Sequence, residues 1–309
     1  MIPHAPKGTD DILPPASEGW RKLLRGFEDL ATRYGYGLTM TPFFEATELF
    51  SRGVGEETEV VEKQMYTFDD KGGRSLTLRP EATASVVRAY LAAGTQGVFK
   101  GYYAGPMFRY EQPQSGRRRQ FYQVGVEYLA EPSPDADVEV IELGYRLLEQ
   151  VGITGVTVRL NSIGDPADRA AYRETLVRFL EERIDLLSDE ATARMGSNPL
   201  RVLDSKADVD VVAEAPAPLD AIGSEAATHF AGVRAGLERR GIRYEISPRL
   251  VRGLDYYNRT VFEYVSDAYT AAQEALGGGG RYDPLAEMLG GPSVPAVGLA
   301  MGIDRIVLA

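Results

Sequence analysis

The stretch FRYEQPQSGRRRQFYQVGVE, residues 108–127, decides the fold. Residues 107–111 and 121–128 each have the composition of a strand, and the polar loop between them contains a glycine and three consecutive arginines. A loop this short can join two antiparallel strands directly. The stretch therefore favours an antiparallel sheet, in which these two strands could pair as a hairpin.

Polar side chains gather on one face of each of these strands. Successive side chains on a strand point to opposite faces, so Arg109 shares a face with Glu111, and Phe121 shares one with Gln123 and Glu127. If the strands pair, their surface would combine arginines that can bind phosphate or carboxylate with a ring that can stack on a base. A salt-bridged sheet surface would show the same pattern, so this segment alone supports both interpretations equally.

Outward from this stretch, the chain predicts more short strands and a few helices. Strands are expected at residues 75–78, 100–104, 156–161, 260–265 and 296–301, with a glycine run at 277–280, and helices at 20–34, 81–91 and 138–151. These elements do not alternate regularly between strand and helix, so a parallel sheet is not indicated. The predicted fold class is α+β, a largely antiparallel sheet with helices packed on it.

Residues 165–241 differ from the rest of the chain in the spacing of their apolar residues and in composition. Tyr172, Leu176 and Leu180 form one helical stripe, Phe230 and Leu237 belong to another, and a stretch rich in proline and alanine separates them. This pattern predicts a mostly helical insertion at 165–241 within a core made of residues 1–164 and 242–309.

Composition excludes several classes of function. The chain of 309 residues has no cysteine and two histidines, His4 and His229, so a disulfide framework, a thiolate nucleophile and a histidine-rich metal site are not expected, and each histidine is expected to be an ordinary surface or packed residue. A net charge of -11 argues against a general nucleic-acid binder, although residues 117–119 form a local basic patch. No apolar run is long enough for a membrane span and no signal peptide is visible, so we expect a cytoplasmic protein.

Motifs that commonly bind nucleotides are absent from the sequence. It contains no G-x-x-x-x-G-K-[ST] and no G-x-G-x-x-G, and it also lacks G-x-S-x-G and H-E-x-x-H. If the chain binds a nucleotide, arginines and strand edges must hold it.

Two further clusters could belong to a binding site. Residues 252–259 place Arg252 beside a glycine and two adjacent tyrosines, Tyr256 and Tyr257, which a turn with a core tyrosine would also explain. Glu81 lies at a strand-to-helix junction, where a carboxylate can bind a ligand ammonium group or simply favour the start of a helix. Neither cluster decides the question by itself.

Taken together, these segments resemble the histidyl-tRNA synthetase family over nearly the whole chain. The resemblance rests on residues 6–9, on the three class II motifs at 36–45, 108–127 and 296–305, and on two segments specific to the histidine enzymes, 250–257 and 278–283. It implies a class II antiparallel sheet, a homodimer, L-histidine, ATP with Mg²⁺, and tRNA(His) as the acceptor.

The resemblance also implies a role for individual residues. Glu81, Thr83 and Gln123 match the groups that hold the histidine α-ammonium group, and Glu127 and Tyr257 match those that contact the imidazole, with Tyr256 and Tyr282 beside them. Arg109 matches the arginine that bridges the substrate carboxylate and the α-phosphate, Arg252 matches a second arginine at the α-phosphate, and Glu111, Arg117, Phe121 and Arg305 match residues around ATP. No metal-binding side chain is predicted.

The chain departs from the family pattern at a few positions. Gln112 stands where arginine is usual in the loop that meets the tRNA acceptor end, Arg118 and Tyr122 where tyrosine and histidine are usual, and Ala82 and Pro284 where glycine is usual. None of these positions carries an implied histidine or α-phosphate contact. Gln112 bears on tRNA charging.

Two other functions remain compatible with the sequence. The family continues beyond motif 3 into an anticodon-binding domain, whereas this sequence stops at Ala309 within an expected helix, so we expect a fragment or truncated form. One alternative is the synthetase-like regulatory subunit of ATP phosphoribosyltransferase, which also lacks that domain. The other is a stand-alone paralogue that transfers activated histidine to another acceptor.

Overall fold

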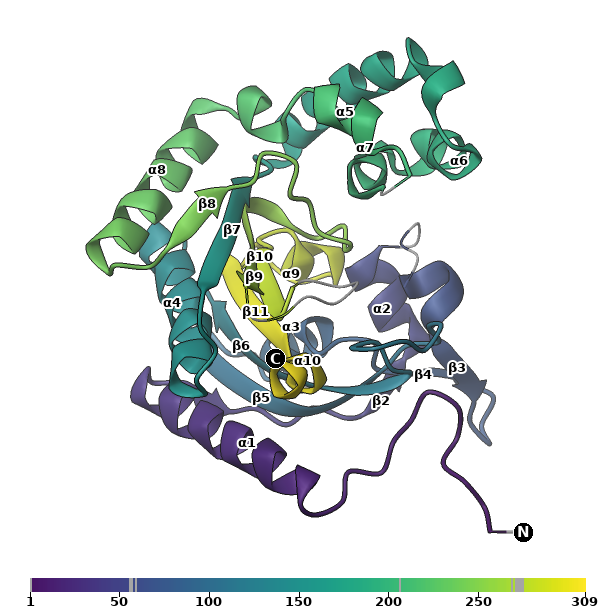
Figure 1. The fold of residues 1–309 in the computed structure, drawn as a ribbon, viewed down its shortest axis with the longest axis vertical. Helices are drawn as coiled ribbons and strands as arrows, with labels where there is room; N and C mark the ends of the chain where they lie inside the picture. The colour runs from purple at the N-terminus through teal and green to yellow at the C-terminus, as the bar shows by residue number, and fades with distance from the viewer. Residues whose placement is uncertain (1, 56–57, 59, 206, 268, 270–274) are drawn as a thin grey trace.

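A computed structural model describes residues 2–55, 58, 60–205, 207–267, 269 and 275–309. Its main sheet has eight strands in the order β1-β5-β6-β11-β10-β9-β7-β8 (Figure 1). In sheet order the strands are β1 Gly37–Leu38, β5 Phe99–Phe108, β6 Gln120–Leu129, β11 Ala296–Gly302, β10 Gly277–Arg281, β9 Asn258–Ser266, β7 Val156–Ser162 and β8 Tyr244–Ile246. Among these pairings only β1 with β5 and β7 with β8 are parallel, which confirms the predicted, largely antiparallel sheet.

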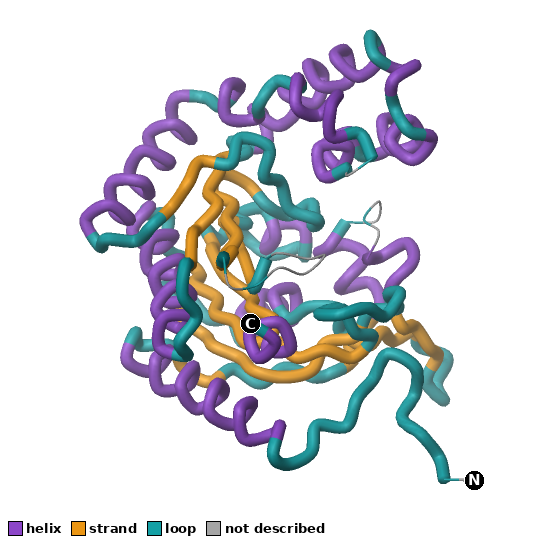
Figure 2. The backbone as a smooth tube through the Cα atoms, viewed as in Figure 1, coloured by secondary structure: helices purple, strands orange, loops and turns teal. Residues whose placement is uncertain are grey.

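Three long helices cover the outer face of this sheet. They are α1 Ala16–Arg33, α4 Pro134–Gln150 and α8 Ser224–Arg239, and their apolar sides share one buried core with the strands (Figures 1 and 2). Gly35, with φ of +83°, follows α1 and allows the chain to turn away. The N-cap of α4 is Ser133, whose hydroxyl accepts a hydrogen bond from the backbone N–H of Asp135.

Smaller elements lie toward the inner face. A three-stranded sheet, in the order β2 Phe44–Ala46, β4 Ser75–Leu78 and β3 Tyr66–Asp69, adjoins α2 Thr47–Val54, the π-helix Val60–Gln64, α3 Thr83–Ala92 and α9 Leu285–Met288. The short helix α10 Ile303–Leu308 follows β11 directly. These elements leave the middle of the inner face open to a pocket.

The sequence predicted two strands at 100–104 and 107–111, and the structure forms one. β5 runs without a break through Gly105 and Pro106 to Phe108. Pro106 is tolerated because β1 reaches only Gly101 and Tyr102, so the edge of β5 at Pro106 needs no backbone donor. Arg109 and Glu111 therefore lie in the loop after the strand, and their predicted common strand face is wrong.

The glycine run 277–280 forms the central strand β10 rather than a turn. A Cβ atom on Gly279 would lie 2.0 Å from the carbonyl oxygen of Gly298 on the neighbouring strand β11. Only glycine allows the strands to approach in this way.

The part of the chain at 165–241 is helical, as predicted. Its elements are α5 Pro166–Glu181, α6 Asp189–Ser197, α7 Val209–Glu214, the 3₁₀ helices Ile184–Leu186, Pro199–Asp204 and Pro218–Ala221, and α8. α5, α6 and α7 stand away from the main sheet, whereas α8 packs along α4 (Figure 1). The division into a core of 1–164 and 242–309 and an insertion stays a prediction. Among the described residues, the helices are too short or too polar to cross a membrane.

Candidate active site

A pocket of about 310 Å³ lies on the inner face of the sheet, over β6, β11 and β10. Buried carboxylates and tyrosines surround one end, which we call the carboxylate end, and arginines surround the other, which we call the arginine end. The carboxylate end consists of Glu81, Thr83, Tyr103, Gln123, Glu127, Tyr256, Tyr257 and Tyr282, and the arginine end of Arg109, Glu111, Arg117, Phe121, Arg252, Glu263 and Arg305.

Glu81 sits at the junction between β4 and α3, as its sequence position indicated. Its carboxylate accepts hydrogen bonds from the backbone N–H groups of Thr83, at 2.6 Å, and Ala84, at 2.9 Å, where α3 begins. Burial raises the pKa of Glu81, and these backbone donors offset part of that rise. A buried carboxylate without an ion-pair partner among the described residues is a good site for an incoming ammonium group.

Glu127 lies deeper in the carboxylate end and is 1% exposed. The Thr83 hydroxyl donates a hydrogen bond to it at 2.7 Å, and the Tyr282 hydroxyl donates a second. Burial raises the pKa of Glu127 to about 8, although both hydrogen bonds lower it. An empty pocket therefore holds this carboxyl group largely protonated near neutral pH.

An amide and three tyrosines complete the carboxylate end. The Oε1 atom of Gln123 is buried and accepts no hydrogen bond from the described residues, so it is available to a ligand N–H group. The rings of Tyr256 and Tyr257 lie 4.7 Å apart, and those of Tyr256 and Tyr282 lie 5.6 Å apart. These rings form an apolar wall with hydroxyl groups, which suits a small aromatic heterocycle.

At the arginine end, Arg109 is held by its Nε atom, which donates to the carbonyl of Pro80 at 2.8 Å. Its guanidinium carbon lies 5.3 Å from the centre of the Phe121 ring. Glu111 forms an ion pair with Arg117 at 2.6 Å. Arg109 thus presents its guanidinium to the pocket, with Nη1 4.0 Å from Oε1 of Glu111, next to a ring on which a base could stack.

Arg252 approaches the same space from the opposite wall. Its Nη1 atom pairs with Glu263 of β9 at 2.5 Å, while its Nε atom has no hydrogen-bond partner among the described residues. Burial opposes the charged form, but Glu263 raises the pKa of Arg252 above its ordinary value, so the guanidinium stays charged.

Arg305 enters the pocket from the first turn of α10. It donates hydrogen bonds to the carbonyls of Gly116, at 3.0 Å, and Ala275, at 2.9 Å. Burial lowers the pKa of Arg305, and the nearby positive charges of Arg117 and Arg109 lower it further. Three arginines of like charge around one space favour the arrival of a polyanion.

Glycines form much of the pocket floor. A Cβ on Gly298 would lie 1.9 Å from Oε2 of Glu127, and one on Gly278 would lie 3.0 Å from Nη1 of Arg252. A side chain at either position would displace a charged group of the site.

The structure gathers the residues that the sequence predicted. All thirteen belong to the pocket, and all but Glu127 line it directly; Glu127 lies behind Thr83 and Tyr282. Tyr103 and Glu263 line the pocket too, and the sequence reasoning missed them. Tyr103 pairs with Gly125 across the strands, and an aromatic residue opposite a glycine was the available signal.

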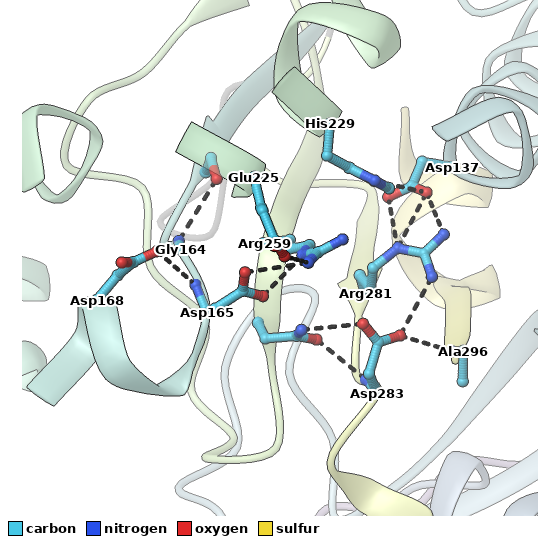
Figure 3. A network of polar contacts seen from close by, with 12 residues as sticks. Asp137, Gly164, Asp165, Asp168, Glu225, His229, Arg259, Arg281, Asp283 and Ala296 are labelled. Atoms are coloured by element: carbon cyan, nitrogen blue, oxygen red, sulfur yellow. Dashed lines mark hydrogen bonds and ion pairs between the residues drawn. The ribbon is translucent and has the colours of Figure 1, made fainter. Parts of the chain in front are cut away.

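Residues that the sequence did not assign to a site have structural roles. His229 is buried and lies 3.2 Å from Asp137, which also pairs with Arg281 (Figure 3). His4 is exposed. Arg118 pairs with Asp10, and Arg119 stacks on Tyr110, so the basic run at 117–119 has a separate partner for each arginine. Among the described residues, no three acidic or histidine side chains form a metal-binding group.

An antiparallel sheet with one arginine just after the long strand β5 and another in the helix α10 that directly follows β11 has the fold of a class II aminoacyl-tRNA synthetase core. The model of the histidyl-tRNA synthetase family matches residues 8–306, and the chain belongs to that family.

Individual relatives agree with this assignment. A histidine–tRNA ligase of Desulforudis audaxviator is 48% identical over 313 residues, which cover 100% of this chain and 74% of the relative. The structure of the Staphylococcus aureus histidyl-tRNA synthetase without ligand matches with a TM-score of 0.80 and 39% identity, covering 99% of this chain and 73% of that one. A Bacillus halodurans protein described as an ATP phosphoribosyltransferase regulatory subunit/histidyl-tRNA synthetase shares the fold, with a TM-score of 0.70, 22% identity, and coverage of 99% and 82%.

Proposed function

We propose that this chain activates L-histidine with ATP to form histidyl-adenylate and transfers the histidyl group to tRNA(His). The observation that carries the proposal is the division of one pocket into a carboxylate end and an arginine end. Histidine has an ammonium group and an imidazole for the first, and its carboxylate and the α-phosphate of ATP suit the second.

At the carboxylate end, Glu81 binds the α-ammonium group, with Thr83 and Gln123 beside it. The positive ammonium group favours the ionised carboxylate of Glu81, and so offsets the rise in pKa that burial causes. The imidazole lies against Tyr256 and Tyr257. A small shift of the Thr83 or Tyr282 side chain lets an imidazole N–H donate a hydrogen bond to Glu127. An apolar analogue would leave these buried polar groups unpaired, so the site rejects it.

At the arginine end, the reaction needs position and charge rather than a base. The histidine carboxylate is already ionised; one of its oxygens bonds to the α-phosphorus while the bond from that phosphorus to the pyrophosphate oxygen breaks. Arg109 and Arg252 hold the two anions together from opposite walls and stabilise the charge that develops between them. Arg305, Arg117, Glu111 and Phe121 hold the rest of ATP.

Mg²⁺ fits this site as a companion of ATP. Glu111 is the carboxylate of the arginine end nearest the loop arginines, and it could supply one oxygen ligand. When bound, Mg²⁺ neutralises charge on the outer phosphates.

A homodimer is part of the proposal because apolar side chains of motif 1 and the small sheet lie in solvent. Met40 is 86% exposed, and Leu38, Phe43, Phe44 and Phe68 are exposed as well. A second copy of the chain would remove this apolar surface from water. Sedimentation velocity tests it, since a monomer at all concentrations would contradict the proposal.

Histidine-dependent ATP–pyrophosphate exchange tests the first half-reaction. We expect label from pyrophosphate to enter ATP only when histidine is present, and no exchange when histidinol, which lacks the carboxylate, replaces it. Failure of the wild-type chain to exceed an Arg252→Ala control would overturn the proposal.

Transfer to tRNA needs its own assay, because Gln112 replaces the usual arginine and is exposed in the loop after β5. We expect aminoacylation of tRNA(His). A chain that forms the adenylate but leaves tRNA(His) uncharged would indicate another acceptor. Activation of a phosphoribosyltransferase by this chain would instead indicate the regulatory role. A cytoplasmic location stays a prediction.

A further inference from the structure

The loop that carries Arg252, Tyr256 and Tyr257 belongs to no helix or strand. Residues 251–257 run between Leu250 and the start of β9. Three side chains that line the pocket depend on the path of this loop, so its position has to come from contacts made by other parts of the chain.

Arg169, in the first turns of α5, makes such contacts. Its Nη1 atom donates to the carbonyl of Asp255 at 3.0 Å and to the carbonyl of Tyr257 at 2.7 Å. One guanidinium nitrogen therefore binds the carbonyl groups of the peptide bonds that precede Tyr256 and follow Tyr257. Burial lowers the pKa of Arg169, and the charge of Asp255 opposes that shift.

A second contact from the same helical region reaches this loop. The Nδ2 atom of Asn198, just after α6, donates to the Asp255 carboxylate at 3.0 Å. On the other side, the backbone N–H of Asp255 donates to the carbonyl of Val54 at the end of α2. The loop is thus held between α2 and the α5–α6 region.

The first turn of α5 is itself fixed to β9. Arg259, which follows the loop, binds Asp165 through two hydrogen bonds of 2.7 and 3.0 Å, and Asp165 caps α5 (Figure 3). Arg259 has a φ of +48°, and its backbone N–H donates to the carbonyl of Gly164 at 2.7 Å. Arg169 therefore projects from a helix start that has little freedom relative to the sheet.

We infer that Arg169 is a positioning residue for histidine: it sets the loop of Tyr256 and Tyr257 against the carboxylate end, and it links the position of α5 to the affinity for histidine. The inference rests on the proposed function, because histidine is the ligand whose ring these tyrosines contact. Arg252, the residue of this loop proposed to contact ATP, is held by its own ion pair with Glu263 rather than by Arg169. The other residues proposed to hold ATP lie on β6, the loop before it and α10.

The substitution Arg169→Met tests the inference, because it keeps an unbranched apolar stem and removes the guanidinium that makes both hydrogen bonds. In pyrophosphate exchange we expect the KM for histidine to rise by about tenfold or more, while the KM for ATP changes by less than about twofold. Arg169→Lys, which retains a donor, should recover part of the affinity for histidine. Arg178→Met on the exposed side of the same helix is the matched control and should behave as wild type.

Amide hydrogen exchange provides a readout that does not need activity. Without ligand, the segment 252–257 should exchange faster in Arg169→Met than in wild type or Arg178→Met, with other segments unchanged. If Arg169→Met does not fold, the comparison of Arg169→Lys with wild type replaces it. Equal KM values for histidine in Arg169→Met and Arg178→Met, or a parallel rise in the KM for ATP, would overturn the inference alone, whereas absence of exchange in wild type would overturn the proposed function.

Discussion

Two arginine–carboxylate pairs lie on opposite faces of β10, and both are 2.5 Å long. Arg252 pairs with Glu263 on the pocket face, next to Gly278, and Arg281 pairs with Asp137 of α4 on the other face. The two arginines come from the two segments that resemble signatures of the histidine enzymes, 250–257 and 278–283.

The difference lies in how many hydrogen bonds each guanidinium makes. Arg281 is 0% exposed and uses all its nitrogens. They donate to Asp137 and Asp283 (Figure 3) and also to the carbonyls of Glu131 and Ser133. Arg252 has one ion pair, and its Nε atom has no hydrogen-bond partner in the described part of the chain. A saturated arginine stabilises the fold, whereas an unsaturated one at a pocket wall is available to a substrate.

The largest effect is expected from Arg281→Met. It removes the main cation beside Asp137 and leaves a buried carboxylate, which should cost about 3–5 kcal/mol of unfolding free energy. Urea denaturation measures this cost. The double variant Arg281→Met/Asp137→Leu should be more stable than the single variant, because no unpaired charge remains. A stability loss below about 1 kcal/mol in the single variant would contradict the comparison.

Arg252→Ala should cost less stability than Arg281→Met, because the Glu263 side chain left behind is 22% exposed to water, and it should remove activity. We expect kcat of pyrophosphate exchange to fall by about 10²–10³-fold, since one donor to the developing charge is lost. Circular dichroism and urea denaturation provide the control for folding. If stability fell as much as in Arg281→Met while kcat stayed within about tenfold, the assignment of the two roles would be reversed.

The carboxylates extend the comparison to pH. Burial alone would raise the pKa of Asp137, but Arg281 and His229 lower it to about 2, whereas burial raises that of Glu127 to about 8. The ordinary pKa of a glutamate is 4.5, so between pH 4.5 and about 8 the folded chain keeps a proton on Glu127 that the unfolded chain releases. Glu127 therefore makes the unfolding free energy fall as the pH rises through this range. Glu127→Gln removes this contribution, and unfolding free energies across that range should differ in slope from wild type by about 1.4 kcal/mol per pH unit. Equal slopes would show that Glu127 is ionised in the empty pocket.

The smallest effect is expected from an exposed pair of the same chemistry. Arg21 and Glu18 in α1 lie 2.5 Å apart with side chains 60% and 59% exposed. Arg21→Ala should change the unfolding free energy by less than about 1 kcal/mol and leave exchange activity as in wild type. A larger change would mean that the contribution of these pairs to stability follows their contact distance rather than their burial and the number of hydrogen bonds that each arginine makes.

The parts of the fold that follow from local patterns were predictable. α1 follows from the spacing of Phe27 and Leu30 with the other apolar residues, and its end from Gly35. The continuity of β5 was not, because Gly105 and Pro106 read as a turn unless one knows that β1 stops short of them. Likewise, the glycines of β10 form a strand only because two neighbouring strands supply all the pairing.

The residues of the site could be predicted, but their hydrogen-bond partners and pKa shifts could not. Resemblance pointed to Glu127 and Arg252, and both belong to the pocket. Their pKa shifts depend on burial by strands distant in sequence, which no local pattern encodes. Arg169 shows the same limit, because its targets are backbone carbonyls, and any residue type would supply them.

The place of β11 in the sheet has a consequence for synthesis on the ribosome. Residues 296–302 are the only described link between β6 on one side and β10 on the other, so without them the strands form two separate groups, β1-β5-β6 and β10-β9-β7-β8. Until this segment leaves the exit tunnel, the edges of β6 and β10 lack the strand that pairs with them, and unpaired strand edges can pair incorrectly or bind chaperones. The adenylate site, divided between the two groups, can form only when that strand closes them.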